Sequence, residues 1–291
     1  MDFVLTIILG FFIFLIGLIP FRVLYIISDF LRFVLYRVVG YRRKVVEDNI
    51  RQSFPDLSVT ERKKLINLSY KNLADIITEG VKAFTMSDKQ IVARHKFINP
   101  EFLTPYLDAG KSVILLPAHY GNWEWGGLSI PLQLDYKYVV VLYKPLSNKF
   151  ADRLVKKNRS RTGIFMGPIF ETAKLFKTYA TQTTAFFLIA DQSPSNSHKS
   201  KWVNFFGRET AFLYGPERYA RLYQLPVIFV DVQRVKRGYY EIEFSLLTDD
   251  PASLPKGEIT ALYARKLEDI IRKKPENWLW SHRRWKLKKT N

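Results

Sequence analysis

Short apolar runs separated by helical stretches constrain the fold of this chain more than any other feature. These runs are residues 112–116, 138–143, 184–189 and 226–232. Strands that are apolar at every position are typical of a parallel sheet whose two faces are both covered by crossover helices. Residues 240–246 alternate polar and apolar side chains, which predicts a more exposed, antiparallel strand. We therefore expect an α/β fold with a mixed, largely parallel sheet covered by helices.

Helices are expected between these strands. Ser58 and Glu61 form a capping-box pattern that opens a helix running to about residue 84. Pro216 is typical of a first helical turn. Further helices are expected at residues 148–157, 170–181, 216–224 and 258–272. The sequence shows no repeat or low-complexity tract, so residues 45–291 are expected to form one domain.

The N-terminal segment is nearly continuous Leu, Ile, Val and Phe from residue 3 to residue 21. A run of about 18 or more apolar residues is long enough to span a bilayer. Asp2 precedes the run and bulky residues follow it, which favours an uncleaved anchor over a signal peptide. Basic residues cluster on its C-terminal side, at Arg22, Arg32, Arg37, Arg42, Arg43 and Lys44. By the positive-inside rule, we predict one transmembrane anchor over residues 1–21 and a cytoplasmic body.

Residues 22–44 have a different pattern. Polar side chains recur there every three to four residues, at Arg22, Tyr25, Asp29, Arg32 and Tyr36. A narrow polar stripe on an otherwise apolar helix predicts an amphipathic helix lying in the headgroup region of a membrane. The alternative is an ordinary core helix packed on the domain.

The charge balance indicates an anionic partner. The chain carries 45 Lys and Arg against 27 Asp and Glu, a formal charge of +18. Nucleic acid, an anionic membrane surface and acidic molecules all suit this charge. The apolar N-terminus favours the membrane, and no nucleic acid partner is expected. Because the sequence has no cysteine, disulfides, a thiol nucleophile and thiolate metal sites are excluded.

One of the four histidines directly follows an apolar strand. His119 comes after residues 113–116 and Pro117-Ala118, and Glu124 lies five positions further on. The two side chains can converge if Gly121 makes a tight turn and Glu124 lies in the first turn of a helix. The carboxyl ends of strands are where open α/β sheets place their sites. We predict that His119 is a general base oriented by Glu124, with a surface or capping pair as the alternative.

Other candidate site residues follow strands or end helices. Arg159 and Arg161 close a basic helix end and are predicted to bind a phosphate, although basic residues also favour a solvated helix C-terminus. Asp191 and Gln192 follow residues 184–189. Asp191 is expected to bind a sugar hydroxyl or to tether a basic residue, with a turn-forming role as the alternative. Asn122 and Gln192 are candidate substrate contacts. No metal site is predicted.

The C-terminal segment combines tryptophans with basic residues. Trp278, Trp280 and Trp285 alternate with Arg283, Arg284, Lys286, Lys288 and Lys289. This pattern suits a membrane interface, base stacking on nucleic acid, or a helix end packed by tryptophans. For His282 we favour a structural hydrogen bond over a catalytic role. The motifs G-x-S-x-G, Walker A, H-E-x-x-H and G-x-G-x-x-G are absent from the sequence.

The sequence "HYGNWE", from His119 to Glu124, resembles the His-x4-Asp/Glu block of glycerolipid acyltransferases. Its form is similar to that of the lipid A biosynthesis (late) acyltransferase family, within the lysophospholipid acyltransferase-like superfamily. The arginine block, the "DQ" of Asp191 and Gln192, the "FFG" at residues 205–207 and the closing "WLWSHRRWK" follow in that family's order. Phe205 and Phe206 are expected to line an acyl groove or to belong to the core.

The resemblance implies an enzyme that moves a fatty acyl chain from an acyl carrier protein, or from coenzyme A, to a hydroxyl of a membrane glycolipid such as a lipid A precursor. In that mechanism His119 deprotonates the acceptor, Glu124 holds the imidazole and Arg159 or Arg161 engages phosphate. No cofactor beyond the thioester is expected, and the location implied is the inner membrane. Three other functions stay open: acylation of another lyso-lipid or aminolipid, non-catalytic binding of anionic lipid or nucleic acid, and thioester hydrolysis.

Overall fold

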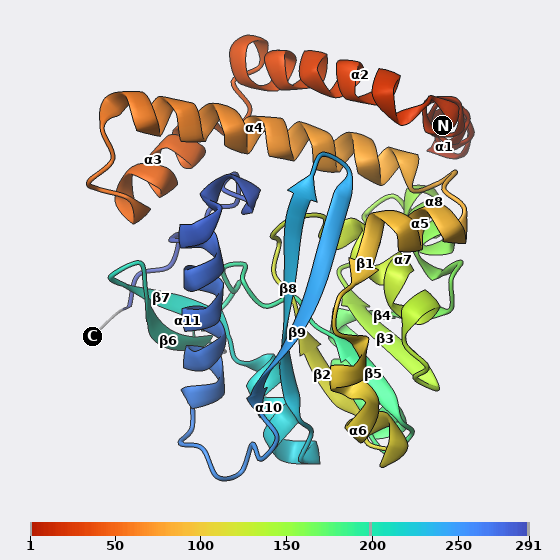
Figure 1. Ribbon diagram of the computed structural model, residues 1–291, viewed down its shortest axis with the longest axis vertical. Coiled ribbons are helices and arrows are strands. Elements are labelled where there is room, and N and C mark those ends of the chain that lie inside the picture. The colour runs from red at the N-terminus through yellow and green to blue at the C-terminus, as the bar shows by residue number, and fades with distance from the viewer. Residues whose placement is uncertain (1, 198–199, 290–291) are drawn as a thin grey trace.

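The structure is a computed structural model and describes residues 2–197 and 200–289. Its largest sheet has seven strands (Figure 1). The strand order is β1-β9-β8-β2-β5-β3-β4, and every neighbouring pair is parallel except β8 with β9. Its strands are β1 (His95–Phe97), β2 (Val113–Leu116), β3 (Tyr138–Tyr143), β4 (Ile164–Pro168), β5 (Thr184–Phe187), β8 (Val227–Lys236) and β9 (Tyr239–Thr248). The predicted mixed, largely parallel sheet is confirmed.

Four strands lie outside the apolar runs that the sequence marked. β1 has only three residues, and β4 contains Gly167 and Pro168, so neither has the continuous apolar pattern of a central strand. The strands β6 (Ser200–Phe205) and β7 (Arg208–Leu213) form a separate antiparallel pair. Phe206 and Gly207, the two residues between them, both have positive φ, which is the backbone of a tight hairpin turn.

Helices cover the sheet. They are α1 (Asp2–Leu18), α2 (Phe21–Phe33), α3 (Arg43–Ser53), α4 (Val59–Lys82), α5 (Asp88–Arg94), α6 (Thr104–Asp108), α7 (Trp123–Gln133), α8 (Lys149–Ser160), α9 (Thr172–Tyr179), α10 (Gly215–Tyr223) and α11 (Glu258–Lys273). A π-helical turn, η1 (Val34–Val38), follows α2. The capping box predicted at Ser58 and Glu61 opens α4. Figure 1 shows α4 crossing one end of the sheet, with α2 alongside it on the side away from the strands.

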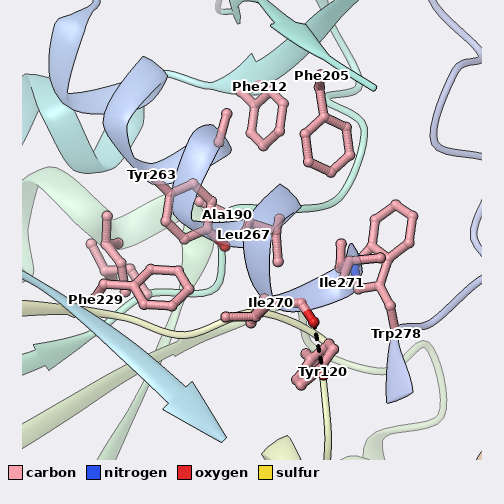
Figure 2. Packing of buried hydrophobic residues seen from close by; sticks show 14 of the residues in the cluster. Tyr120, Ala190, Phe205, Phe212, Phe229, Tyr263, Leu267, Ile270, Ile271 and Trp278 are labelled. Carbon is pink, nitrogen blue, oxygen red and sulfur yellow. Dashed lines mark hydrogen bonds between the residues drawn. The ribbon is translucent and has the colours of Figure 1, made fainter. Parts of the chain in front are cut away.

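The sheet divides the core into two apolar layers, because alternate residues of each buried strand point to opposite faces. Figure 2 shows part of the layer beneath α11, where Tyr263 and Leu267 of that helix face Phe229 of β8. Phe205, at the end of β6, also belongs to this layer and is fully buried. Phe206 is 6% exposed, so both phenylalanines of the "FFG" element are core residues.

The predicted N-terminal span is not found in the described residues. The apolar run folds as α1, which has 17 residues and ends at Leu18, two residues before Pro20. None of the helices in residues 2–197 and 200–289 combines the length and the hydropathy that a bilayer span requires. Residue 1 of the predicted anchor lies outside the described part of the chain.

Residues 22–44, predicted to form one amphipathic helix, are divided among α2, η1, a turn and the start of α3. Within this segment α2 is amphipathic, and its apolar side faces outward. The outward residues Val23, Ile26, Ile27, Phe30 and Phe33 are between 37% and 69% exposed. Its polar residues face the domain instead, where Ser28 donates to Asp75 of α4 (2.6 Å) and Asp29 pairs with Arg237 (2.8 Å). An ordinary core helix would bury its apolar side, so that alternative does not describe α2.

Candidate active site

His119 and Asp191 meet at one edge of the sheet. β2 and β5 are adjacent and parallel, so the segments that follow them leave the sheet at the same edge. The Nδ1 atom of His119 lies 2.7 Å from Oδ1 of Asp191, and the backbone N–H of His119 donates to Oδ2 of the same carboxylate (3.1 Å). Of the predicted roles of Asp191, the structure therefore shows the tethering of a basic residue, which is His119.

The carboxylate of Asp191 is buried but strongly hydrogen-bonded. It is 2% exposed, and the indole N–H of Trp278 donates to Oδ2 (2.9 Å). Burial alone would raise the pKa of Asp191, but the charge and hydrogen bonds of His119 together with the Trp278 bond lower it overall. Asp191 is therefore ionised at neutral pH and accepts the Nδ1–H of the imidazole.

The other imidazole nitrogen faces a polar, partly open environment. In the neutral ring with its proton on Nδ1 toward Asp191, Nε2 carries the lone pair and can accept from the Gln192 amide nitrogen, which lies 3.2 Å away. The His119 side chain is 18% exposed, and the Trp123 ring packs edge-on against it at 5.1 Å between centroids. This tautomer leaves Nε2 able to take a proton from a hydroxyl that replaces the Gln192 amide.

Glu124 does not orient His119, so that prediction is corrected. Gly121 makes the tight turn and Glu124 lies in the first turn of α7, both as expected. That turn directs the carboxylate toward α8, where both of its oxygens accept from Arg159 at 2.7–3.2 Å. The side chains of Glu124 and Arg159 remain 29% and 33% exposed, so the ion pair lies at the surface of the site.

Gly121 and Asn122 build the turn that carries His119. Gly121 has φ +61°, and a Cβ there would lie 2.4 Å from the carbonyl oxygen of Val232, so only glycine fits. The Asn122 side chain caps α7 by accepting from the N–H of Trp125 (3.0 Å). Because Asn122 is fully buried, its role lies in this turn and not in the substrate contact that was predicted.

Glu79 of α4 binds the side chain of Asn122 by a hydrogen bond. Its Oε2 accepts from the Asn122 amide (2.6 Å) and from Tyr240 (2.8 Å), and Oε1 accepts from Tyr25 of α2 (2.8 Å). Burial raises the pKa of Glu79 to about 7. This buried carboxylate, which was not among the predicted site residues, connects α2 with the turn that carries His119.

Arg161 binds groups of the protein itself. Its guanidinium donates to the carbonyl oxygens of Met86 (2.7 Å) and Ala83 (3.3 Å) and pairs with Asp88 (3.1 Å). These bonds tie the end of α8 to the connection between α4 and α5. Of the two arginines predicted to bind phosphate, the structure places Arg159 beside the His119 turn.

Residues 277–279 of the C-terminal segment form backbone hydrogen bonds with the turn that carries His119. Leu279 N–H donates to the carbonyl oxygen of His119 (3.0 Å), and Gly121 N–H donates to that of Asn277 (3.0 Å). Trp278 and Trp280 are 3% and 1% exposed, so they belong to the core and form no surface for a membrane or a nucleic acid. Packed tryptophans were one of the predicted alternatives, but their contact with the site was missed because it joins residues far apart in sequence.

The same segment holds the residues that follow Asp191. Nε2 of His282 accepts from the backbone N–H of Ser193 (2.9 Å). Burial lowers the pKa of His282 to about 4, so the ring is neutral and keeps this acceptor at neutral pH. The favoured structural hydrogen bond of His282 is present, and it fixes the backbone two residues from the Asp191 carboxylate.

The chain is similar in sequence to lipid A biosynthesis acyltransferases. A family described as bacterial lipid A biosynthesis acyltransferase matches residues 3–287. The lipid A biosynthesis lauroyltransferase of Escherichia coli (strain K12) is 23% identical over 270 residues, which are 92% of this chain and 86% of that protein. The lipid A biosynthesis palmitoleoyltransferase of the same strain and the lipid A biosynthesis acyltransferase of Shigella flexneri are each 23% identical over 251 residues, 84% of this chain and 79% of theirs.

Proposed function

The chain belongs to the bacterial lipid A biosynthesis acyltransferase family, and from this premise we propose that it transfers a fatty acyl chain from a thioester to a hydroxyl of a lipid A precursor. The observation that carries this proposal is the His119–Asp191 pair, in which Asp191 holds Nδ1 and the imidazole, 18% exposed, directs Nε2 toward the Gln192 amide. Such a pair suits deprotonation of an alcohol at neutral pH, and a positioned base contributes about 10²–10⁴-fold to a rate.

The reaction proceeds by direct transfer. Nε2 of His119 takes the proton of the acceptor hydroxyl as its oxygen attacks the thioester carbonyl carbon. The C–S bond of the tetrahedral intermediate then breaks, and the imidazolium returns the proton to the thiolate leaving group. The ionised Asp191 stabilises the imidazolium between these steps. No covalent acyl-enzyme forms, because the acceptor oxygen is itself the nucleophile.

Arg159 and Gln192 bind substrate in this proposal. Arg159 uses Nε and Nη2 on Glu124, which leaves Nη1 outside that pair to bind a phosphate of the acceptor or donor. Gln192, whose amide occupies the position beside Nε2, moves toward the reacting carbonyl when the acceptor hydroxyl binds. The acyl donor is an acyl carrier protein, with coenzyme A as the second candidate.

Membrane lipid contacts the outward face of α2 in this proposal. Further exposed apolar residues lie in α1 and at the end of η1, where Phe11, Phe12, Val38 and the next residue, Val39, are more than half exposed. An apolar face of this extent on a soluble surface is unusual, whereas it suits the acyl boundary of a bilayer at which lipid A precursors lie. Anionic headgroups suit the flanking arginines.

Replacing two outward residues of α2 with aspartate should weaken membrane binding. An Ile26→Asp/Phe30→Asp variant places two charges where the proposal puts acyl chains, so sedimentation with phosphatidylethanolamine–phosphatidylglycerol vesicles should fall about tenfold or more. A Phe170→Asp/Leu222→Asp variant is the matched control, because it makes the same change at two exposed apolar residues outside α1, α2 and η1. Undiminished sedimentation of the α2 variant would contradict this role for α2.

Mass spectrometry of membrane lipids tests the proposed reaction. Cells that lack the chain should accumulate a lipid A species that is lighter by one acyl chain, and the wild-type chain should restore the full mass. A His119→Ala variant should leave the lighter species in place, because it removes the proposed base. The proposal would be contradicted if loss of the chain left the lipid profile unchanged, or if His119→Ala restored the full mass.

A further inference from the structure

One exposed face of α8 carries only cations. Lys149, Arg153, Lys156 and Lys157 are all exposed and recur at helical spacing, so they form one stripe along about two turns. The acidic residue of this helix, Asp152, is turned to Tyr143 and to the backbone N–H of Leu146. No ion pair in residues 2–197 and 200–289 joins the stripe to a carboxylate.

This stripe lies beside the candidate active site. The last turn of α8 carries Arg159, which pairs with Glu124 at the start of α7, directly after the His119 turn. The rise of an α-helix puts Lys149 about 15 Å from Arg159 along α8. On another flank α8 contacts α1, where Leu154 packs near Gly10, and Figure 1 shows both helices at the same end of α4. The stripe therefore lies on the helix whose last turn joins, through Arg159 and Glu124, the segment directly after His119.

We propose that the cationic stripe of α8 binds the acidic surface of the protein that carries the acyl thioester, an inference that rests on the proposed acyl transfer. A carrier protein must dock close enough for its flexible prosthetic arm to reach Nε2 of His119. Cations spaced along one helix match acidic side chains spaced along another, and such charge complementarity speeds encounter and fixes orientation. The stripe gives the carrier a docking face within about 15 Å of Arg159, measured along α8.

An acidic protein suits this stripe better than lipid headgroups do. Surfaces that rest on a membrane interleave exposed apolar side chains with cations, as α2 does with its exposed Arg22. In α8 none of the large apolar residues is among the exposed ones; Leu146 and Phe165, which are exposed, lie outside the helix. The stripe is thus a cationic surface without exposed large apolar side chains, on a helix that contacts the apolar helix α1.

Charge reversal on α8 tests the proposal through two donors. We compare Lys149→Glu/Arg153→Glu/Lys156→Glu with wild type, using lauroyl-loaded acyl carrier protein and lauroyl-pantetheine, which presents the same thioester without the protein. The KM for the carrier-bound donor should rise about 10- to 100-fold while kcat and the KM for lauroyl-pantetheine stay unchanged. Rising salt should raise the wild-type KM for the carrier-bound donor and leave the variant nearly insensitive.

The control reverses three exposed lysines elsewhere, in Lys63→Glu/Lys64→Glu/Lys266→Glu, with the same change in net charge. An equal rise of KM in the control would show that total charge, and not the stripe, attracts the carrier. Loss of vesicle sedimentation by the α8 variant with an unchanged KM would assign the stripe to phosphatidylglycerol headgroups. Either result overturns the proposal.

Direct binding separates this proposal from the proposed function. Fluorescence anisotropy of labelled, acyl-loaded carrier protein should show a Kd that weakens about 10- to 100-fold in the α8 variant, whether or not transfer to lipid A occurs. Equal binding by wild type and variant would overturn the docking surface while leaving the acyl transfer intact. Binding without any transfer by wild type would contradict the proposed function and retain the docking surface.

Discussion

An Asp191→Asn variant is expected to lose about 10²–10⁴-fold in kcat. The amide keeps the size of the carboxylate but removes the charge that stabilises the imidazolium, and its NH₂ group favours the wrong tautomer of His119. The Asp191 oxygens also accept from the His119 backbone and from Trp278, so Asn must satisfy three donors with one oxygen. The measurement is kcat and KM for acyl transfer with saturating thioester donor, with circular dichroism to confirm folding.

Glu124→Gln is the matched control, because it makes the same chemical change at the carboxylate nearest in sequence to His119. This variant weakens a partly exposed ion pair with Arg159, so we expect a raised KM and a loss of kcat below about tenfold. The opposite ranking, with Glu124→Gln nearly inactive and Asp191→Asn nearly wild type, would restore Glu124 as the orienting acid and contradict the geometry.

An Asp75→Ala variant is expected to lose about 3–5 kcal/mol of stability, because it leaves buried guanidinium charge without its partner. Asp75 is fully buried and bonds to Arg234 (2.5 Å), Arg237 (2.6 Å) and Ser28 (2.6 Å). It thereby joins α2 and the β8–β9 hairpin to α4. Thermal unfolding in detergent should show the melting temperature falling by roughly 10 °C.

Asp29→Ala is the control for this cluster. Asp29 also pairs with Arg237, but its side chain is 45% exposed and solvent replaces part of the lost interaction. We expect a loss of about 1 kcal/mol or less. Similar losses in both variants would mean that burial of Asp75 does not determine the stability of this cluster.

Strands with continuous apolar sequence were predictable, whereas short edge strands were not. β3 was predicted with its exact bounds, and β2, β5 and β8 to within a few residues, because each contains a run of apolar residues. β1 is too short for such a pattern. The outward apolar face of α2 also could not be predicted, since periodicity identifies an amphipathic helix but not what covers its apolar side.

The candidate site was predicted in its residues but not in its pairing. His119, Asp191 and Gln192 were all named because they follow apolar strands. Their contact depends on strand order, and β5 lies beside β2 although β3 and β4 come between them in the sequence. Glu124, the predicted partner of His119, is five residues away from it in the sequence, whereas the observed partner Asp191 is 72 residues away. Order within a parallel sheet is set by long-range packing, which local patterns do not contain.

A single-turnover transfer assay tests the central claim most directly. Purified wild-type and His119→Ala chains are mixed with radiolabelled lauroyl thioester and a lipid A precursor that lacks one acyl chain, in detergent micelles. The account predicts that wild type moves the label to the lipid with no label on the protein, and that His119→Ala is slower by about 10²–10⁴-fold. Transfer at the wild-type rate by His119→Ala, or label trapped covalently on the protein, would contradict direct transfer by a His119 base.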